Sequence, residues 1–152
     1  MSEIEIVPME RRHLDAAAEL ERLCFSQPWS RQGLEEELEN PLAFFYVALL
    51  EGKTAGYAGM HCVAGEAYAA NIAVFPEFRR RGVGRALAQK LVESARSEGC
   101  SFLSLEARAS NEAAVSLYRG LGFQEEGRRK RFYTSPQEDA VILTLRFPEN
   151  QT

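Results

Sequence analysis

A cluster of glycines and arginines follows a strand-like run near the middle of the chain. Gly82 and Gly84 open a predicted helix, and four arginines lie within residues 79–85: Arg79, Arg80, Arg81 and Arg85. Glycine allows the backbone to approach a ligand closely, and the free N–H groups and dipole at a helix start attract anions. The pattern predicts a site for a pyrophosphate-bearing ligand. A helix start with solvated arginines is the alternative, because short motifs often match by chance.

Two common phosphate-binding loops fit this stretch poorly. A P-loop ends in Gly-Lys-Ser/Thr, whereas Arg85-Ala86 follow Gly84 here. A dinucleotide-binding fingerprint would place glycine at position 87, which is Leu87, and it usually opens the first βαβ unit of a fold. Both loop types are therefore disfavoured.

The residues around the loop resemble a known family. Asn71-Ile72-Ala73-Val74-x-Pro76 precedes R-x-x-G-x-G at Arg79 to Gly84, and further matches follow in order: Leu105 to Asn111, Ala114, Leu117-Tyr118 and Leu121-Gly122-Phe123. This combination resembles the acetyl-CoA-binding motif of the GNAT acetyltransferases. Two outer segments resemble the subgroup that acetylates the N-terminal alanine of a ribosomal protein: Phe25-x-x-Pro28-Trp29-Ser30 and Tyr133-x-x-Pro136-x-Glu138-Asp139-Ala140. The resemblance covers most of the chain.

The resemblance implies acetyl-CoA as co-substrate, bound by two segments. The pantetheine arm is expected to pair with the strand of Ile72, Ala73 and Val74, and the backbone N–H of Val74 to polarise the thioester carbonyl. The pyrophosphate is expected at the loop and helix start: Arg79, Arg80, Arg81, Gly82, Val83, Gly84 and Arg85. Asn111 can cap a helix, and the resemblance also gives it a contact to CoA.

Glu106 and Tyr118 resemble the general base and general acid of the family. An α-amine has a pKa of about 7.7–8.0, so a modest base suffices to deprotonate it. Tyr118 would protonate the departing CoA thiolate. The alternatives are a strand glutamate in an ordinary ion pair and a tyrosine buried on one face with Ala114 and Leu121. Direct transfer in a ternary complex is expected, without an acyl-enzyme.

The resemblance also implies a protein N-terminus as acceptor, typically alanine. Four residues could line its groove, with core packing or solvation as the alternative: Trp29, Tyr133, Glu138 and Asp139. Ala107 stands where the subgroup commonly carries valine, and Ala69-Ala70 replace bulkier residues, which bears on acceptor specificity. Other acceptors stay open, namely another protein N-terminus or a small amine such as an aminoglycoside or polyamine. An inactive CoA-binding module is the third hypothesis, which the presence of both Glu106 and Tyr118 disfavours.

The charge of the chain is unevenly distributed. Its 152 residues include 18 Lys or Arg and 22 Asp or Glu, for a formal net charge of −4. Without the four loop arginines, 14 basic residues face 22 acidic ones. An acidic body argues against a surface devoted to nucleic acid, so we expect no direct nucleic-acid binding. It suits a basic partner such as a ribosomal protein.

The cysteines and histidines argue against disulfides and metal sites. Cys24, Cys62 and Cys100 are far apart and form no C-x-x-C motif, and Cys62 and Cys100 are not expected to be nucleophiles. His13 and His61 have no neighbours at metal-ligand spacing, so we expect no metal. The first residues lack a signal-peptide pattern, and the longest apolar run is too short to cross a bilayer. We therefore expect a cytoplasmic protein without membrane contact.

Hydrophobic periodicity predicts alternating blocks of strands and helices. Strands are expected over residues 4–8, 44–50, 55–63, 68–74, 102–107, 127–133 and 140–147, and helical stripes over 14–23, 30–38, 83–95 and 113–121. The second to fourth strands should form an antiparallel meander, and the last two an antiparallel pair. The sequence thus predicts one domain over residues 1–152, an α/β or α+β sheet covered by helices. The resemblance implies a mixed, mostly antiparallel GNAT-like sheet.

Overall fold

A computed structural model describes residues 3–148. Its strands are β1 (Glu5–Pro8), β2 (Ala43–Leu50), β3 (Lys53–Val63), β4 (Glu66–Val74), β5 (Phe102–Arg108), β6 (Gln124–Tyr133) and β7 (Glu138–Arg146). Its α-helices are α1 (Leu14–Cys24), α2 (Arg31–Leu38), α3 (Val83–Ser97) and α4 (Glu112–Gly120). Two short 3-10 helices, η1 (Arg11–His13) and η2 (Pro76–Phe78), are additional to the predicted elements.

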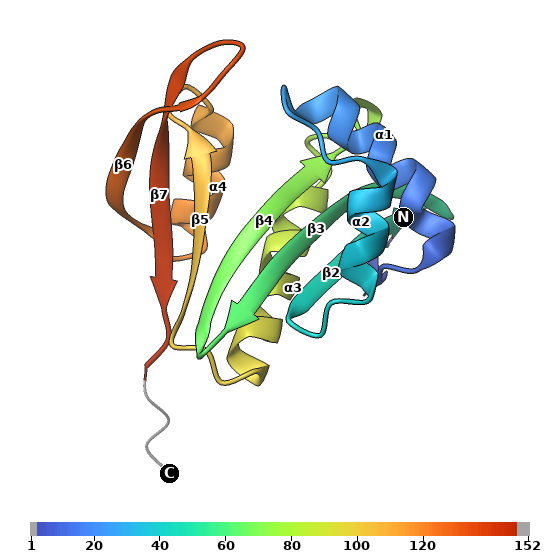
Figure 1. The fold of residues 1–152 in the computed structure, drawn as a ribbon, viewed down its shortest axis with the longest axis horizontal. Coiled ribbons are helices and arrows are strands. Elements are labelled where there is room, and N and C mark those ends of the chain that lie inside the picture. Colours follow the sequence, from blue (N-terminus) through green and yellow to red (C-terminus); the bar gives the residue numbers. More distant parts are fainter. Residues whose placement is uncertain (1–2, 149–152) are drawn as a thin grey trace.

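The seven strands form one sheet in the order β1-β2-β3-β4-β5-β7-β6. All neighbouring strands are antiparallel except β4 and β5, which are parallel and joined through α3. The predicted meander and the predicted final pair are both confirmed. The sequence did not reveal that β7 lies between β5 and β6, which leaves β6 at the edge of the sheet (Figure 1).

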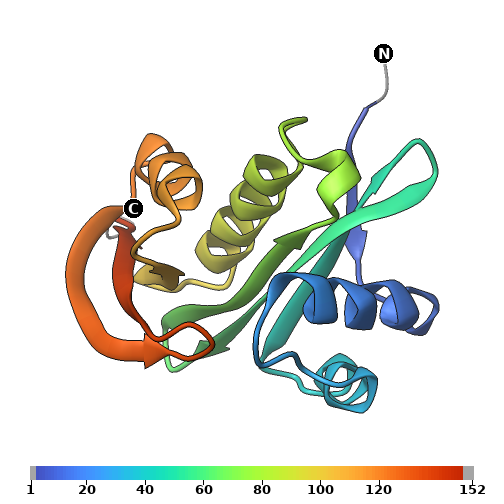
Figure 2. The ribbon, with the colours of Figure 1, turned by 90° about the horizontal axis from the view of Figure 1, so that it is seen from above.

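The helices cover both faces of the sheet. Helices α1 and α2 lie against one face, and α3 and α4 against the other (Figure 2). Helix α3 contacts every strand from β1 to β5, whereas α1 contacts β3 and β4. The mixed, mostly antiparallel sheet flanked by helices is therefore confirmed.

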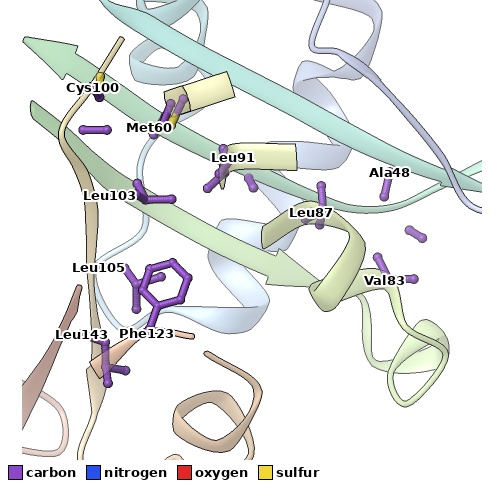
Figure 3. Close-up of a cluster of buried hydrophobic side chains, with 14 of the residues drawn as sticks. Ala48, Met60, Val83, Leu87, Leu91, Cys100, Leu103, Leu105, Phe123 and Leu143 are labelled. Atoms are coloured by element: carbon purple, nitrogen blue, oxygen red, sulfur yellow. The ribbon is translucent and has the colours of Figure 1, made fainter. Parts of the chain in front are cut away.

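The larger core cluster lies between α3 and the sheet. Val83, Leu87, Leu91 and Ala95 are at most 1% exposed, as their spacing on one helical face predicts. Figure 3 shows the side chains of Val83, Leu87 and Leu91 in one cluster with Met60 and the strand leucines Leu103 and Leu105. Burying each large apolar side chain stabilises the fold by roughly 1.5–3 kcal/mol, so this layer holds α3 firmly on the sheet.

The stripe predicted for α1 needs one correction. Leu14, Ala17 and Leu20 are buried in a second cluster beneath α1 and α2, but Leu23 is 54% exposed. The helical period of 3.6 residues places Glu21 on the buried face instead, where its side chain is 0% exposed. A buried carboxylate at that position was not predicted from the sequence.

Two predicted helix starts are confirmed by their caps. Ser30 Oγ accepts a hydrogen bond from the N–H of Gly33 at 3.0 Å and begins α2. Asn111 Oδ1 accepts one from the N–H of Ala114 at 3.2 Å and begins α4. These contacts satisfy amide groups that have no partner within the helix. Within residues 3–148, the helices are all too short or too polar to cross a membrane.

Candidate active site

The strands β4 and β5 pair only near one end. Glu66 pairs with Phe102, and the last pair joins Tyr68 to Ser104. Beyond that pair the two strands separate, as Figure 1 shows. Backbone groups along the facing edges are therefore free of a strand partner, and such an edge can pair with an extended ligand.

The backbone of Val74 points into this gap. The N–H of Phe75 donates to the carbonyl of Ala55 at 2.8 Å, so Phe75 is bonded to β3. Because bonding direction alternates along an antiparallel strand, the N–H groups of Val74 and Ile72 point away from β3. The thiol of Cys24 lies 3.8 Å from the carbonyl oxygen of Val74, which agrees with that direction.

A bulge precedes this part of β4. Gly59 pairs with Asn71 and Met60 with Ala69, so Ala70 has no partner on β3. Bulges bend a strand and are frequent beside active sites. The small residues noted in the sequence at 69–70 therefore lie where β4 turns away from β5.

Helix α3 begins with unbonded amide groups. Gly82 has φ 84°, a conformation that favours glycine, and the N–H of Ala86 makes the bond to the carbonyl of Gly82 at 3.0 Å. The amides of residues 83–85 precede it, and the described helix start has neither a side-chain cap nor an acidic residue in its first turn. Such a terminus is suited to an anion.

Gly84 places this terminus beside the gap. A Cβ atom built on Gly84 would lie 3.8 Å from side-chain atoms of both Val74 and Leu117. The start of α3 is therefore flanked by the end of β4 and by α4. The open backbone edge of β4 and the amide groups of α3 therefore lie close together, and their predicted binding of pantetheine and pyrophosphate stays a prediction.

The four loop arginines do not form one group. Arg81 donates a hydrogen bond at 3.0 Å to Glu51, which lies in the turn between β2 and β3. Arg79 Nη2 lies 3.9 Å from the sulfur of Cys24, on the side of α1. The other two are exposed: Arg80 and Arg85. Their predicted binding to a pyrophosphate stays a prediction, and Arg81 would have to leave Glu51 to take part.

Glu106 lies in β5 and forms an ion pair with β6. Arg129 Nε lies 3.1 Å from Glu106 Oε1, and the carboxylate side chain is 27% exposed. Burial, and then the charge of Glu106, raises the pKa of Tyr133 to about 12. The guanidinium carbon of Arg108 lies 4.6 Å from the centre of the Tyr133 ring. The ion pair considered from the sequence is present, and it involves the carboxylate proposed as the base.

Tyr118 lies in α4 with its ring against the core. Its ring centre is 5.9 Å from that of Phe123. Burial, and then the neighbouring Tyr133, raises the pKa of Tyr118 to about 12. The hydroxyl is thus a neutral proton donor at physiological pH. Tyr133 therefore lies near both Glu106 and Tyr118.

Trp29 lies apart from the other predicted acceptor residues. Its ring centre is 6.0 Å from that of Phe45, and the partly buried side chain packs against the core beneath α1 and α2. Core packing, the alternative to a role in the acceptor groove, therefore describes the Trp29 side chain. Tyr133, by contrast, lies beside Glu106.

The two acids of β7 hold its hairpin. Glu138 accepts hydrogen bonds from the N–H of Ser110 and from Arg108, and these bonds, those of Ser110 first, lower the pKa of Glu138. Asp139 Oδ1 accepts the N–H of Arg131 at 3.0 Å, where β6 bulges away from β7. Neither carboxylate is simply solvated, because each already has a protein partner.

The model of the acetyltransferase (GNAT) family matches residues 14–123. The chain belongs to this family. GNAT acetyltransferases use acetyl-CoA, and the chain is an acetyl-CoA-dependent N-acetyltransferase. The open edge of β4 and the start of α3 lie within the matched residues.

Curated relatives of this acetyltransferase match along most of its length. The [ribosomal protein bS18]-alanine N-acetyltransferase of Escherichia coli (strain K12) is 37% identical over 142 residues, covering 92% of this chain and 95% of the relative. N-alpha-acetyltransferase RimI of Mycobacterium tuberculosis is 34% identical over 146 residues, covering 92% and 90%.

Solved acetyltransferase structures share the fold. The ribosomal-protein-S18-alanine N-acetyltransferase from Escherichia coli superposes with a TM-score of 0.87 at 34% identity, over 99% of both chains. The NatC complex bound to Gag peptide and CoA gives a TM-score of 0.83 at 24% identity, covering 96% of this chain and 99% of that one. This second likeness concerns the fold alone.

Arg108 is a feature of this acetyltransferase that the sequence interpretation missed. Its guanidinium donates to the carbonyls of Pro136 at 2.9 Å and Thr134 at 3.0 Å, and to Ser26 Oγ at 3.3 Å. It therefore connects the β6–β7 turn with the segment that follows α1. The available signal was its position two residues after Glu106, on the same face of β5.

Glu21 is a second missed residue. One carboxylate oxygen accepts the N–H of Trp29 at 2.8 Å, and the other accepts Asn71 Nδ2 at 2.7 Å and the hydroxyl of Tyr57. Burial, followed by the charge of Glu21, raises the pKa of Tyr57. The buried carboxylate joins α1, β3 and the open part of β4. Its position on the apolar stripe of α1 was the sequence feature that could have revealed a buried carboxylate.

Proposed function

We propose that this acetyltransferase transfers the acetyl group of acetyl-CoA to the α-amine of an N-terminal alanine, on a small-subunit ribosomal protein. The observation that carries this proposal is the open edge of β4, which lies next to β5, the strand of Glu106, and beside the uncapped start of α3. The names of the relatives at 37% identity support this acceptor.

The two halves of acetyl-CoA would occupy the two sides of the gap. The pantetheine arm would pair with the backbone of Ile72 and Val74, whose N–H groups point away from β3. The pyrophosphate would bind the amides of residues 83–85, with Arg80 and Arg85 available to it. The co-substrate supplies an acetyl group on a thioester, which an amine can attack.

The protein would act on charge and protons around that thioester. The N–H of Val74 is placed to stabilise negative charge that develops on the carbonyl oxygen, since a fixed donor needs no reorganisation. Glu106 would accept the proton of the α-amine. Tyr118 would donate a proton to the CoA thiolate, which its raised pKa allows at neutral pH. Transfer would be direct, with both substrates bound.

The acceptor would enter between the α1–α2 segment and the β6–β7 hairpin. Arg108 joins the two, because it contacts Ser26 and the carbonyl of Thr134. Tyr133, which lies beside Glu106, would contact the peptide. Outside the loop arginines the chain is acidic, which favours a basic protein partner. We expect the enzyme to act in the cytoplasm, without binding nucleic acid or membrane itself.

The test uses a peptide that bears the N-terminal sequence of the ribosomal acceptor, beginning with alanine. Incubation with acetyl-CoA should add one acetyl group, and fragment spectra should place it on the α-amine. Glu106→Gln should lower turnover by about 10²-fold or more while leaving the affinity for acetyl-CoA unchanged. No product on the peptide would refute the acceptor, and unchanged turnover in the variant would refute the base.

A further inference from the structure

Arg129 forms an ion pair with Glu106, the carboxylate proposed to accept the proton of the α-amine. Its Nε lies 3.1 Å from Glu106 Oε1, and its guanidinium carbon lies 5.4 Å from the centre of the Phe132 ring. Arg129 is 57% exposed, so it can leave the carboxylate at small cost, whereas Glu106 is 27% exposed. Glu106 is largely buried, so losing the ion pair with Arg129 would cost stabilisation unless another cation took its place.

The incoming acceptor is such a cation. With a pKa of about 7.7–8.0, an α-amine is mostly ammonium at neutral pH. It offers N–H donors and one positive charge, as the guanidinium does.

The shape of β6 allows this exchange. Arg129 pairs with Ala140 and Tyr133 with Glu138, so three residues of β6 face one residue of β7. The bulge is fastened where Asp139 accepts the N–H of Arg131. Phe132 is 47% exposed on this bulge, and its ring already lies within cation–π range of Arg129, so the guanidinium can keep this contact when it leaves the carboxylate.

We propose that Arg129 is a positioning residue that exchanges with the acceptor ammonium on Glu106 and thereby distinguishes substrate from product. The free amine displaces Arg129. The acetylated product is a neutral amide and cannot hold the carboxylate, so Arg129 returns to Glu106 and favours release of the product. This inference rests on the proposed role of Glu106 and on an N-terminal α-amine as acceptor.

Binding measurements on the full chain with saturating CoA test the exchange. Two peptides are compared by calorimetry: the alanine peptide with a free α-amine and the same peptide N-acetylated. Arg129→Gln should lower the Kd of the free-amine peptide about two- to fivefold, as loss of a partly exposed ion pair predicts, and should not tighten binding of the acetylated peptide. Arg129→Lys, which keeps the cation, should resemble the wild type.

Arg128 provides the matched control. It lies on the same strand and pairs with Glu125 at 3.3 Å instead, so Arg128→Gln should leave both Kd values unchanged. In a Glu106→Gln background, Arg129→Gln should have no further effect, because the shared partner is gone.

Three outcomes would overturn the proposal: an unchanged Kd in Arg129→Gln, weaker binding of the free amine, or equal tightening of both peptides. Turnover of Glu106→Gln is a separate readout. Normal turnover in that variant would refute the base, whereas the contrast between the two arginine variants still decides whether Arg129 and the ammonium share the carboxylate.

Discussion

The carboxylate of Glu21 accepts a hydrogen bond from Asn71 Nδ2 at 2.7 Å, which ties helix α1 to the open part of β4. Asn71 immediately follows the bulge at Ala70 and precedes the residues proposed to pair with acetyl-CoA. The same carboxylate accepts the N–H of Trp29 at 2.8 Å, in the segment between α1 and α2 that flanks the proposed acceptor entrance. One buried side chain thus ties that segment to the strand proposed to pair with acetyl-CoA.

Glu21→Gln should destabilise the protein. Three donors converge on the carboxylate, and an amide would present its own N–H groups to at least one of them. An unsatisfied buried donor costs about 1–3 kcal/mol, equivalent to a fall in Tm of about 2–4 °C per kcal/mol for a chain of this size. Thermal melting checks this. Tyr57→Phe removes one donor only and should cost less; equal Tm values for Glu21→Gln and the wild type would contradict the role of Glu21.

Gly84→Ala should separate stability from cofactor binding. The added methyl group would lie 3.8 Å from its nearest neighbours, an ordinary contact, and alanine favours a helix over glycine by up to about 1 kcal/mol. Tm should therefore hold or rise. The methyl group would occupy the approach to the helix start, so affinity for acetyl-CoA should fall on the order of tenfold.

Calorimetry with acetyl-CoA measures the loss in Gly84→Ala. Gly120→Ala is the matched control, because a Cβ there would meet no atom within 4 Å and the residue lies at the far end of α4. If both variants bound acetyl-CoA like the wild type, the start of α3 would not be the cofactor site.

Tyr118 should stay protonated well above neutral pH. Burial raises the pKa of Tyr118 from 10.0 to about 12, and because the raised value favours the neutral phenol, the acid form persists until the pH approaches 12. The kcat of the wild type should therefore show no loss with a midpoint near pH 10. Tyr118→Phe should lower kcat about 10²-fold at pH 8 while keeping the ring packing against Phe123. A wild-type midpoint near pH 10 that disappears in Tyr118→Phe would show an ordinary tyrosine pKa.

Cys24 contacts the backbone of Val74, yet direct transfer does not need its thiol. Its sulfur lies 3.8 Å from the carbonyl oxygen of Val74. Cys24→Ala should keep turnover within about twofold, since the sulfur makes only weak hydrogen bonds, and rapid mixing should show no burst of acetylated enzyme. A burst in the wild type that Cys24→Ala abolishes would establish an acyl-enzyme instead.

Local patterns predicted the elements of this fold well. Val83, Leu87 and Leu91 share a helical face in the sequence and are buried together in the structure. Ser30 and Asn111 cap the helices that their side chains favour. These features depend on neighbours within a few residues, which a sequence displays directly.

The arrangement of the site depended on partners distant in the chain. Glu21 and Asn71 are fifty residues apart, and no local period connects them. Glu106 and Arg129 meet only because β7 inserts between β5 and β6 and the bulge bends β6. Trp29 lies in a segment that resembles the subgroup and was proposed to line the acceptor groove, but its ring packs on Phe45. Strand order and bulges therefore decided what the residue types alone could not.

The proposed acceptor is tested most directly by competition between amines. The purified chain is given acetyl-CoA and measured with the N-terminal alanine peptide, the same peptide blocked at its α-amine, a polyamine and an aminoglycoside. We expect kcat/KM for the free alanine peptide to exceed that for each small amine by at least about 10²-fold, with no acetylation of the blocked peptide. A higher kcat/KM for a small amine, or acetylation of the blocked peptide at the same rate, would contradict the proposed acceptor.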